Sequence, residues 1–513
     1  MFDAFEIINK IKKNLTRQDL LLLLLFLGLF ITSRLINLDR FPIFGDEGIY
    51  VRWAKVAWHD ASWRFISLTD GKQPLQTWGI IPFLKFFPQN PLLAGRLFSV
   101  ATGGFGLVGL VSCCYYLFGK RSMYFAAFFY IFTPFFLFYD RMALVDSAVN
   151  AFAIWIFFLS IILIRTIRLD VALIYGLMTG MALLAKSSVR LFLGLGFLAI
   201  IFLVSVQKKT SDRRDVIKKS INYSILYFLS STLALVIYNI QRLSPFFHYI
   251  AEKNKTFVMT LGEFTKSPFV NFLGNIKIIP YYVLSEMGYV ISLIGLIGLY
   301  FLFKKDKRLA QYIVLWIIIP FVILGFVSKV IFPRYLIFVG SMLIIPAVYV
   351  ISQVKNKTTL IITMVLIVLS ITYFDYAIVF DHKNIPFPEV DRGQYVEGVT
   401  AGWGIKEIVD YSRQKSKEKK VILLAEGNFG VIGDQIDAYL WPIENMELRG
   451  YWPLDKNELL QNQKELTTNY VYVIFSHRQD FPVDWPIKHI KRYGKPGDKA
   501  AIYFSELLPP GSF

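Results

Sequence analysis

The sequence predicts an all-α polytopic membrane protein that carries a small α/β domain at its C-terminal end. Of the 513 residues, 55% are hydrophobic and 17% are aromatic, a composition that soluble domains of this length do not show. Apolar segments of about 18 residues recur along the chain, and each is long enough to cross a hydrocarbon core of about 30 Å. After residue 375, short apolar strands alternate with polar helical stretches, which is typical of an α/β domain.

Residues 1–375 are predicted to form a transmembrane domain of about eleven helices. Two connections are long. Loop 39–90 is rich in tryptophan and is expected to form helices that lie along the lipid headgroups. Loop 241–286 mixes aromatic and basic residues, and such long loops in a tightly connected bundle are often functional. The predicted spans are residues 20–38, 91–117, 123–139, 146–164, 171–186, 190–206, 220–240, 287–303, 310–327, 335–352 and 358–374.

Lysine and arginine residues gather in every second connection between the predicted spans. Because basic loops stay in the cytoplasm, this side is predicted to be cytoplasmic, and the protein is expected to be a multi-pass protein of the plasma membrane. The N-terminus then lies inside, whereas residue 46 and the C-terminal domain lie outside. The basic residues are Lys10, Lys12, Lys13, Arg17, Lys120, Arg121, Arg165, Arg168, Lys208, Lys209, Arg213, Arg214, Lys218, Lys219, Lys304, Lys305, Lys307, Arg308, Lys355 and Lys357.

The net charge of +18 does not indicate nucleic-acid binding. The basic excess lies in the membrane half of the chain, whereas nucleic-acid proteins cluster it on a soluble face. The first apolar run is long and no small-residue cleavage site follows it, so a cleaved signal peptide is not expected. The only cysteines, Cys113 and Cys114, are adjacent within a predicted span, which argues against a disulfide framework and a zinc site.

Residues 376–513 are predicted to form the extracytoplasmic α/β domain. A stretch rich in proline and glycine, 381–404, leads into an expected amphipathic helix at 405–413. The expected strands are 421–425, 470–475 and 500–504.

Two carboxylates, Asp46 and Glu47, lie together in the first outer loop. Charged groups held beside a bilayer are costly unless they have a function. One interpretation is structural, because carboxylates are favoured in the first turn of a helix. The other is a catalytic general base, Asp46, with Glu47 as a neighbour that tunes it or binds a cation. In that case the like charge of Glu47 is expected to raise the pKa of Asp46.

Lys72, Arg141 and Asp146 lie in two further outer segments. Lys72 ends the first outer loop, where it either reaches the headgroups or is directed at a phosphate. Arg141 and Asp146 belong to the turn between the third and fourth spans. Asp146 would start the fourth span, so an N-cap role is the structural alternative to a role in a site.

Lys186 lies in the outer turn between the fifth and sixth spans, and Arg334 and Tyr335 lie between the ninth and tenth. Each is also explained by an ordinary interfacial anchor. Taken together, however, the outer turns bring two or three carboxylates and several cations to one level of the membrane. This convergence is stronger evidence for a functional site than any single motif.

His248, in the second outer loop, is the candidate for a metal ligand. Together with Glu47, Asp146 or Glu252 it could help to hold a divalent cation. A lone histidine is more often structural, and the spacing of these residues does not require a metal. A divalent cation is therefore the one cofactor that the sequence leaves open.

The order of these motifs resembles that of the GT-C membrane glycosyltransferases. It is most similar to the bacterial branch of glycosyltransferase family 39, the relatives of protein O-mannosyltransferases and of the aminoarabinose transferase. The resemblance covers about residues 20–350. Two positions depart from the family pattern: Gln73 and Val145 stand where proline is usual. The motifs are Asp46-Glu47, Lys72-Gln73-Pro74-Leu75, Arg96-Leu97, Arg141 to Asp146, Lys186-Ser187 and Pro333 to Leu336.

The resemblance implies a GT-C-like fold and inverting transfer of a sugar from a polyprenyl-phosphate donor in the bilayer. The acceptor would be an extracytoplasmic hydroxyl of a protein Ser or Thr, a lipid or a glycan. Asp46 would act as the general base. Asp146 and Glu47 would orient the acceptor, position a cation, or hold Arg141 or Lys72. The residues expected to bind the donor phosphate are Lys72, Arg141, Lys186, Arg334 and Tyr335.

Two other functions remain open at this stage. A transporter or lipid flippase is one, although transporters often place their charges near the bilayer midplane between two related halves. Here the charges lie at the outer rim, and the chain shows no similarity between its halves. The other is a non-catalytic scaffold whose outer α/β domain binds carbohydrate.

Overall fold

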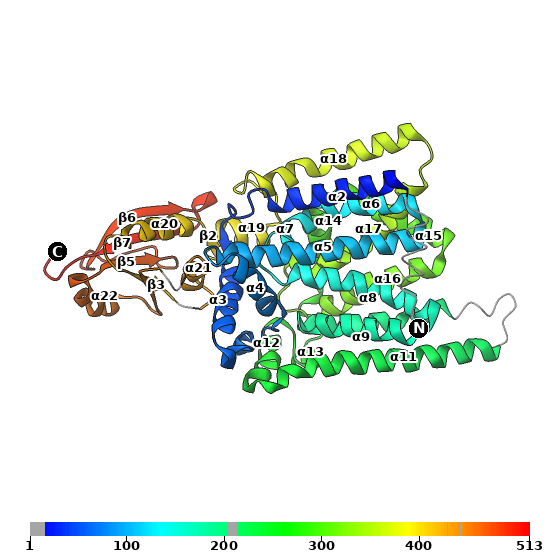
Figure 1. Cartoon of the computed structure of the whole chain (residues 1–513), viewed down its shortest axis with the longest axis horizontal. Helices are drawn as coiled ribbons and strands as arrows, with labels where there is room; N and C mark the ends of the chain where they lie inside the picture. Colours follow the sequence, from blue (N-terminus) through cyan, green and yellow to red (C-terminus); the bar gives the residue numbers. More distant parts are fainter. Residues whose placement is uncertain (1–15, 204–212, 428, 442–443, 513) are drawn as a thin grey trace.

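The computed structural model describes residues 16–203, 213–427, 429–441 and 444–512. It consists of a helical bundle with an α/β domain at one end (Figure 1). The predicted fold class is confirmed. Part of the predicted sixth span, residues 204–206, and five of the basic residues lie outside the described residues; these five are Lys10, Lys12, Lys13, Lys208 and Lys209.

Seven helices in the described part of the chain are long and apolar enough to cross a membrane. An eighth candidate is the pair α14 (Phe272–Met287) and α15 (Tyr289–Lys305), in which the chain direction bends by 109° between the two helices. The seven are built on α2 (Arg17–Leu35), α5 (Pro91–Phe118), α8 (Asp146–Thr166), α11 (Arg213–Asn239), α16 (Lys307–Val327), α17 (Ile337–Gln353) and α18 (Lys357–Val379).

Three other predicted spans fold into shorter helices. Pro134 has no N–H to continue the preceding helix, so one of them divides into α6 and α7. In the bent pair, Gly288 takes a positive φ of 81°, which suits glycine. The count of eleven stays a prediction. The short helices are α6 (Lys120–Phe132), α7 (Pro134–Tyr139), α9 (Leu169–Leu183) and α10 (Arg190–Phe197), which continues into η4 (Leu198–Phe202).

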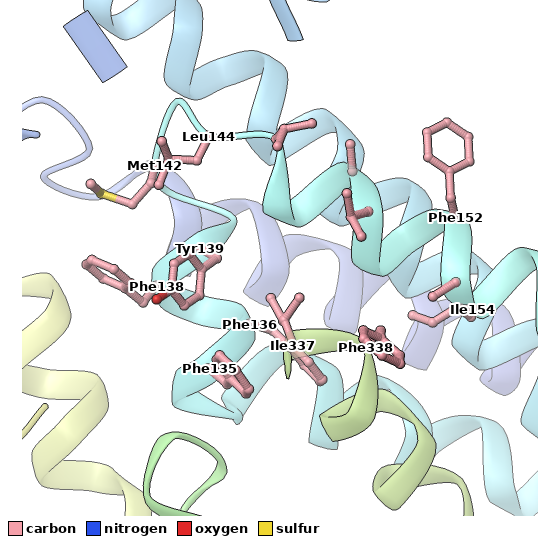
Figure 2. Close-up of a cluster of buried hydrophobic side chains, with 14 of the residues drawn as sticks. Phe135, Phe136, Phe138, Tyr139, Met142, Leu144, Phe152, Ile154, Ile337 and Phe338 are labelled. Atoms are coloured by element: carbon pink, nitrogen blue, oxygen red, sulfur yellow. The ribbon is translucent and has the colours of Figure 1, made fainter. Parts of the chain in front are cut away.

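The helices α8 and α17 form the middle of the bundle, since 89% and 83% of their apolar windows are buried. By contrast, only 17%, 22% and 28% of the apolar windows of α2, α11 and α18 are buried, as expected for helices at the edge of the bundle. The six residues of α7 are all buried. Figure 2 shows its aromatic side chains grouped with Ile337 and Phe338, next to the turn that carries Met142 and Leu144. The bundle core therefore supports this turn directly.

The two long loops fold into short helices at the end of the bundle that carries the α/β domain (Figure 1). Loop 39–90 is largely helical, and the position of its helices along the lipid headgroups stays a prediction. Its elements are α3 (Gly45–His59), η1 (Ala61–Trp63), η2 (Ile66–Asp70) and α4 (Leu75–Phe86). The second loop contains η6 (Ile240–Leu243), η7 (Pro245–His248), α12 (Tyr249–Phe257), α13 (Leu261–Lys266) and α14.

The C-terminal domain contains a five-stranded sheet with the order β4-β3-β5-β7-β6. β3 runs parallel to β4 and β5, whereas β7 pairs antiparallel with β5 and β6. The three predicted strands and the helix at 405–413 are confirmed. The elements are α19 (Glu389–Arg392), η9 (Gly393–Glu397), β2 (Ala401–Gly402), α20 (Ile405–Lys415), β3 (Val421–Glu426), α21 (Ile432–Asp437), β4 (Met446–Tyr451), α22 (Lys456–Asn462), η10 (Gln463–Thr467), β5 (Tyr470–Phe475), β6 (Ile487–Gly494), η11 (Pro496–Asp498) and β7 (Ala501–Leu507).

Two strands of this sheet, β4 and β6, are absent from the sequence prediction. Both lie at the edges of the sheet, β4 is only partly buried along its length, and β6 is mostly exposed. Polar edge strands lack the apolar runs that mark a buried strand. The predicted domain boundary at residue 375 falls inside α18, which continues to Val379.

The C-terminal domain is joined to the segment just before Asp46. The short strand β1 (Ile43–Phe44) pairs antiparallel with β2. The backbone N–H of Gly45 donates to the carbonyl of Thr400 at 3.1 Å. α21 packs on α3 so closely that a Cβ at Gly48 would lie 2.8 Å from the backbone of Asp434. The first turn of α3 is therefore held from both domains.

Candidate active site

The first turn of α3 directs its two carboxylates in different directions. The Asp46 side chain is 27% exposed, whereas the Glu47 side chain is fully buried. Successive residues of a helix point about 100° apart, so neighbours in sequence need not share a site.

Glu47 is paired with Arg96 of α5. Its two oxygens accept from Nε and Nη2 of Arg96, both at 2.8 Å. They also accept from the backbone N–H of Ala143 at 2.7 Å and of Phe44 at 3.0 Å. Glu47 thus ties α3 to α5 and to the 140–146 turn. It faces away from the site for which it was predicted as a catalytic or metal-binding residue, because Arg96 stabilises it in the interior.

Arg96→Leu is expected to destabilise the protein by about 3–5 kcal/mol, because it leaves the Glu47 carboxylate buried without its cation. Thermal unfolding in detergent measures the effect, with Arg40→Leu as the control, since Arg40 is exposed in the same loop region. Equal unfolding temperatures for the two variants would contradict the structural role of this pair.

Asp46 lies between two cations. Its Oδ1 is 3.1 Å from Nζ of Lys72, and its Oδ2 is 3.1 Å from Nη2 of Arg334. Lys72 follows the turn after η2, and Arg334 belongs to η8 (Pro333–Leu336). Lys72 also lies 3.6 Å from Asp70, which pairs with Lys253 at 2.7 Å. Four segments of the chain thus contribute to one ion-pair cluster.

The surroundings of Asp46 set its ionisation. Burial would raise the pKa of Asp46, but the charges of Lys72 and Arg334 outweigh burial and hold that pKa well below its usual range. The prediction that Glu47 raises the pKa of Asp46 is therefore wrong, because Glu47 points away and is neutralised by Arg96. With both cations in place, Asp46 is an ionised hydrogen-bond acceptor at any physiological pH.

A second ion pair lies across the same space. Asp146 is the first residue of α8, as predicted, and its Oδ1 is 2.7 Å from Nζ of Lys186. The ammonium group of Lys186 lies 4.3 Å from the ring centroid of Tyr335, where the ring face attracts a cation. Lys186 therefore contacts both Asp146 and Tyr335.

Arg141 does not take part in either ion pair. Its Nη1 donates to the carbonyls of Ser33 and Arg34 at 2.8 and 2.9 Å. These carbonyls lie in the last turn of α2, which has unpaired carbonyls and a partial negative charge. Arg141 therefore supports the 140–146 turn, and the structure does not bring it to the position expected of a phosphate ligand.

The proposed metal ligands do not meet. His248 is exposed in η7, where its Nδ1 lies 3.0 Å from the carbonyl of Pro245. Glu47 faces Arg96, and Asp146 faces Lys186. Across the described ranges, no group of three or more His, Cys, Asp or Glu side chains is placed to hold a metal ion. The predicted set of Glu47, Asp146 and His248 is thus not a single site.

One cavity of about 700 Å³ contains both ion pairs, a size typical of small-molecule sites. The predicted residues that line it are Asp46, Lys72, Asp146, Lys186, Arg334 and Tyr335. Much of the remaining wall is apolar and comes from the bundle and the second outer loop: Leu144, Val149, Leu191, Phe192, Phe257, Val258, Leu324, Val330, Phe332 and Phe338. A polar end with paired charges thus opens into an apolar space.

Solved structures share this architecture. The crystal structure of ArnT from Cupriavidus metallidurans in the apo state matches with a TM-score of 0.61 and 13% sequence identity, over 94% of this chain and 97% of that chain. The structure of the same protein bound to undecaprenyl phosphate matches with a TM-score of 0.59 and 12% identity, over 94% and 97%. The chain has the GT-C fold.

A third solved structure extends the comparison. The Archaeoglobus fulgidus oligosaccharyltransferase, in complex with zinc and sulfate, matches with a TM-score of 0.52 and 11% identity, over 88% of this chain and 67% of that chain. No protein-family model matches the chain, and no curated protein matches it. The GT-C fold and the apolar helices together make the chain a multi-pass membrane protein.

The lining of this GT-C cavity also includes polar residues that are absent from the predicted site, among them Lys253, Gln394 and Thr400. Lys253 belongs to α12 in loop 241–286, where its charge and the length of the loop were the available signals. Gln394 and Thr400 come from the start of the C-terminal domain. Gln394 lies in η9 and Thr400 in the turn before β2, and neither belongs to a charged or motif-like stretch, so the sequence gives no sign of their role at the cavity.

Proposed function

We propose that this GT-C protein is an inverting glycosyltransferase that moves a sugar from a polyprenyl-phosphate donor to an extracytoplasmic hydroxyl. The observation that carries the proposal is the cavity itself, in which a carboxylate between two cations adjoins an apolar space. The structural likeness to ArnT bound to undecaprenyl phosphate supports the donor class.

Asp46 is the proposed general base. A hydroxyl is a poor nucleophile until its proton is taken, and a positioned carboxylate contributes about 10²–10⁴-fold in rate by taking it. The hydroxyl oxygen then attacks the anomeric carbon from the face opposite the phosphate. The bond between that carbon and the phosphate oxygen breaks, and the phosphate leaves with the electron pair.

Lys72 and Arg334 are the proposed partners of the leaving phosphate. Cations held in place stabilise the charge that develops on the phosphate oxygens. The planar fork of Arg334 suits two phosphate oxygens, whereas Lys72 acts as a point charge. Lys186, held by Asp146 and Tyr335, would contribute a third charge, and Asp146 would orient the acceptor.

The apolar part of the cavity is the proposed location of the prenyl chain. Its lining from α8, α10, α12, α16 and α17 would keep the chain out of water. The donor then remains in the bilayer while its phosphate reaches the cations. We also infer from the basic turns that the N-terminus is cytoplasmic, and that the cavity and the α/β domain are extracytoplasmic.

A deletion strain tests the proposed function. Mass spectrometry of its glycolipids and glycoproteins is expected to show the loss of one sugar modification, which the wild-type gene restores and an Asp46→Asn gene does not. The donor sugar can be a hexose or a pentose, and the acceptor a protein, a lipid or a glycan. Unchanged glycolipids and glycoproteins would contradict a transferase.

A further inference from the structure

The sheet of the C-terminal domain has a topological switch point between β3 and β4, which are neighbouring parallel strands. The helix after β3, α21, packs with Leu423 and Ala425 on one face of the sheet. The helix after β4, α22, packs through Leu459 with Ile422 and Leu424 on the opposite face. Open α/β sheets bind ligands outside the carboxyl ends of their strands at such a point, so the residues that follow β3 and β4 are the place to look for a ligand.

Trp452, the residue directly after β4, lies over the end of β3. A Cβ at Gly427, the residue directly after β3, would lie 3.4 Å from Cε3 of the indole ring. The same indole meets the ring of His477, which follows β5, edge to face, with 5.2 Å between the ring centroids. Because β3 lies between β4 and β5, the indole spans the carboxyl ends of three parallel strands. Trp452 is nevertheless 66% exposed.

The backbone around this indole is held firmly. The buried carboxylate of Glu426, the last residue of β3, accepts from the backbone N–H of Ser476, His477 and Arg478, at 2.8, 2.7 and 3.1 Å. The N–H of Gly427 donates to the carbonyl of Tyr451, the last residue of β4, at 2.7 Å. The ends of the three strands are thus tied to one another. A large apolar ring on such a support, left mostly in solvent, is typical of an interaction site.

The connection from β3 to α21 brings this region to the proposed base. The ring of Phe429 is 47% exposed, and its centroid lies 6.1 Å from that of Trp53 in α3. The carbonyl oxygen of Gly430 would lie 3.3 Å from a Cβ at Gly45, which directly precedes Asp46. In Figure 1, α21 lies between the sheet and α3. The carboxyl ends of the strands therefore adjoin the turn that carries Asp46.

The chemistry of these side chains suits a sugar ring. A pyranose has a face of C–H groups, which packs on the electron-rich face of an aromatic ring, and it has hydroxyl groups around its rim. The indole of Trp452 and the ring of Phe429 offer exposed faces of this kind. The imidazole of His477, whose side chain is partly exposed beside Trp452, can donate to or accept from a hydroxyl.

We propose that Phe429, Trp452 and His477 form a carbohydrate-binding platform, and that this platform holds a sugar ring of the acceptor beside Asp46. The acceptor is accordingly a glycan or a glycolipid. The acceptor role rests on the proposed function, whereas the binding of carbohydrate by the platform does not depend on it. The three side chains bind the acceptor and leave the proton transfer to Asp46.

A binding experiment tests the platform without turnover. The full chain in nanodiscs is applied to an array of glycans and to an array of peptides that contain serine and threonine. Trp452→Leu, which removes the ring, is expected to lower the glycan signal about tenfold, whereas Trp452→Phe retains most of it. Trp63→Leu is the matched control, because Trp63 of η1 is also a partly exposed tryptophan, at 39%, and its signal is expected to equal that of the wild type.

Two results of the binding experiment would overturn the proposal. One is a wild-type protein that binds no glycan, or that binds glycans equally well after Trp452→Leu. The other is binding of the peptides in place of the glycans, lost in Trp452→Leu, which would assign the platform to a protein acceptor. The unfolding temperature of each variant is measured alongside, and an exposed ring such as Trp452 is expected to affect it little.

Steady-state kinetics separates the platform from the proposed function. For Trp452→Leu the acceptor KM is expected to rise about tenfold, with kcat and the donor KM close to the wild type. A raised donor KM with an unchanged acceptor KM would overturn the acceptor role. If sugar transfer is absent but glycan binding depends on Trp452, the proposed function fails and the platform stands. If transfer is found and Trp452→Leu changes neither KM, the platform is overturned and the proposed function stands.

Discussion

Asp46→Asn is expected to lose sugar transfer by about 10²–10⁴-fold and, at the same time, to bind undecaprenyl phosphate more tightly than the wild-type protein. In the structure both oxygens of Asp46 are paired, one with Lys72 and one with Arg334. A donor phosphate must compete with Asp46 for these cations. An asparagine keeps the shape but removes the competing charge.

The gain in affinity is expected to be modest. Exchanging an ion pair at a partly exposed site is worth about 1 kcal/mol, which corresponds to about a fivefold lower Kd. Titration of undecaprenyl phosphate into protein held in nanodiscs measures it, and Asp60→Asn serves as the control, because Asp60 is the exposed acid at the end of the same helix. Weaker binding by Asp46→Asn would show that Asp46 does not compete with the phosphate.

This competition also gives the two ion pairs of Asp46 a role in the proposed reaction. While Lys72 and Arg334 hold Asp46, the pKa of its carboxyl is too low for efficient proton transfer. A phosphate that draws both cations away would release the carboxylate and raise its basicity. The base would then become effective only after the donor is bound.

Arg334→Leu is expected to lower kcat/KM by about 10²–10³-fold, since removal of one preorganised donor to a developing anion costs about 2.7–4 kcal/mol. Unlike Asp46→Asn, it is expected to weaken the binding of undecaprenyl phosphate. Arg334→Lys retains a charge but not the planar fork, so we expect it to recover only part of the loss. The measurement is steady-state kinetics with a polyprenyl-phosphate sugar, for the wild-type protein, Arg334→Leu and Arg334→Lys.

The control for this series is Arg242→Leu, because Arg242 is an exposed arginine of the second outer loop whose Nε donates to Asn239. Its kinetics are expected to match those of the wild type. Arg334 also contacts Tyr395, so the unfolding temperature of each variant is measured alongside. Normal donor binding by a folded Arg334→Leu protein would remove Arg334 from the phosphate site.

The C-terminal domain takes part in building the site rather than only covering it. Its strand β2 pairs with β1 directly before Asp46, and Thr400 and Gln394 line the cavity. The side chain of Gln435 adds hydrogen bonds to the carbonyls of Thr400 and Ile43, at 2.7 and 3.3 Å. These contacts hold the first turn of α3, which carries the proposed base Asp46.

The sequence alone was sufficient for the membrane fold and for the meeting of the charged turns at one cavity. Hydrophobic length is a local property, and it places each span without knowledge of its neighbours. Once the spans alternate, the turns that carry Asp46, Lys72, Asp146 and Arg334 must lie at one end of the bundle. The strands β3, β5 and β7 were predictable for the same reason, because a buried strand is a continuous run of apolar residues.

The orientation of individual side chains could not be predicted from the sequence, because it depends on partners that are distant along the chain. Asp46 and Glu47 are neighbours with the same charge, yet one meets Lys72 and the other meets Arg96. Arg141 was predicted to bind the donor phosphate, but its guanidinium group donates to backbone carbonyls at the end of α2. Charge and burial act over a few ångströms, so packing determines which group each charge meets, and with it the pKa of the proposed base.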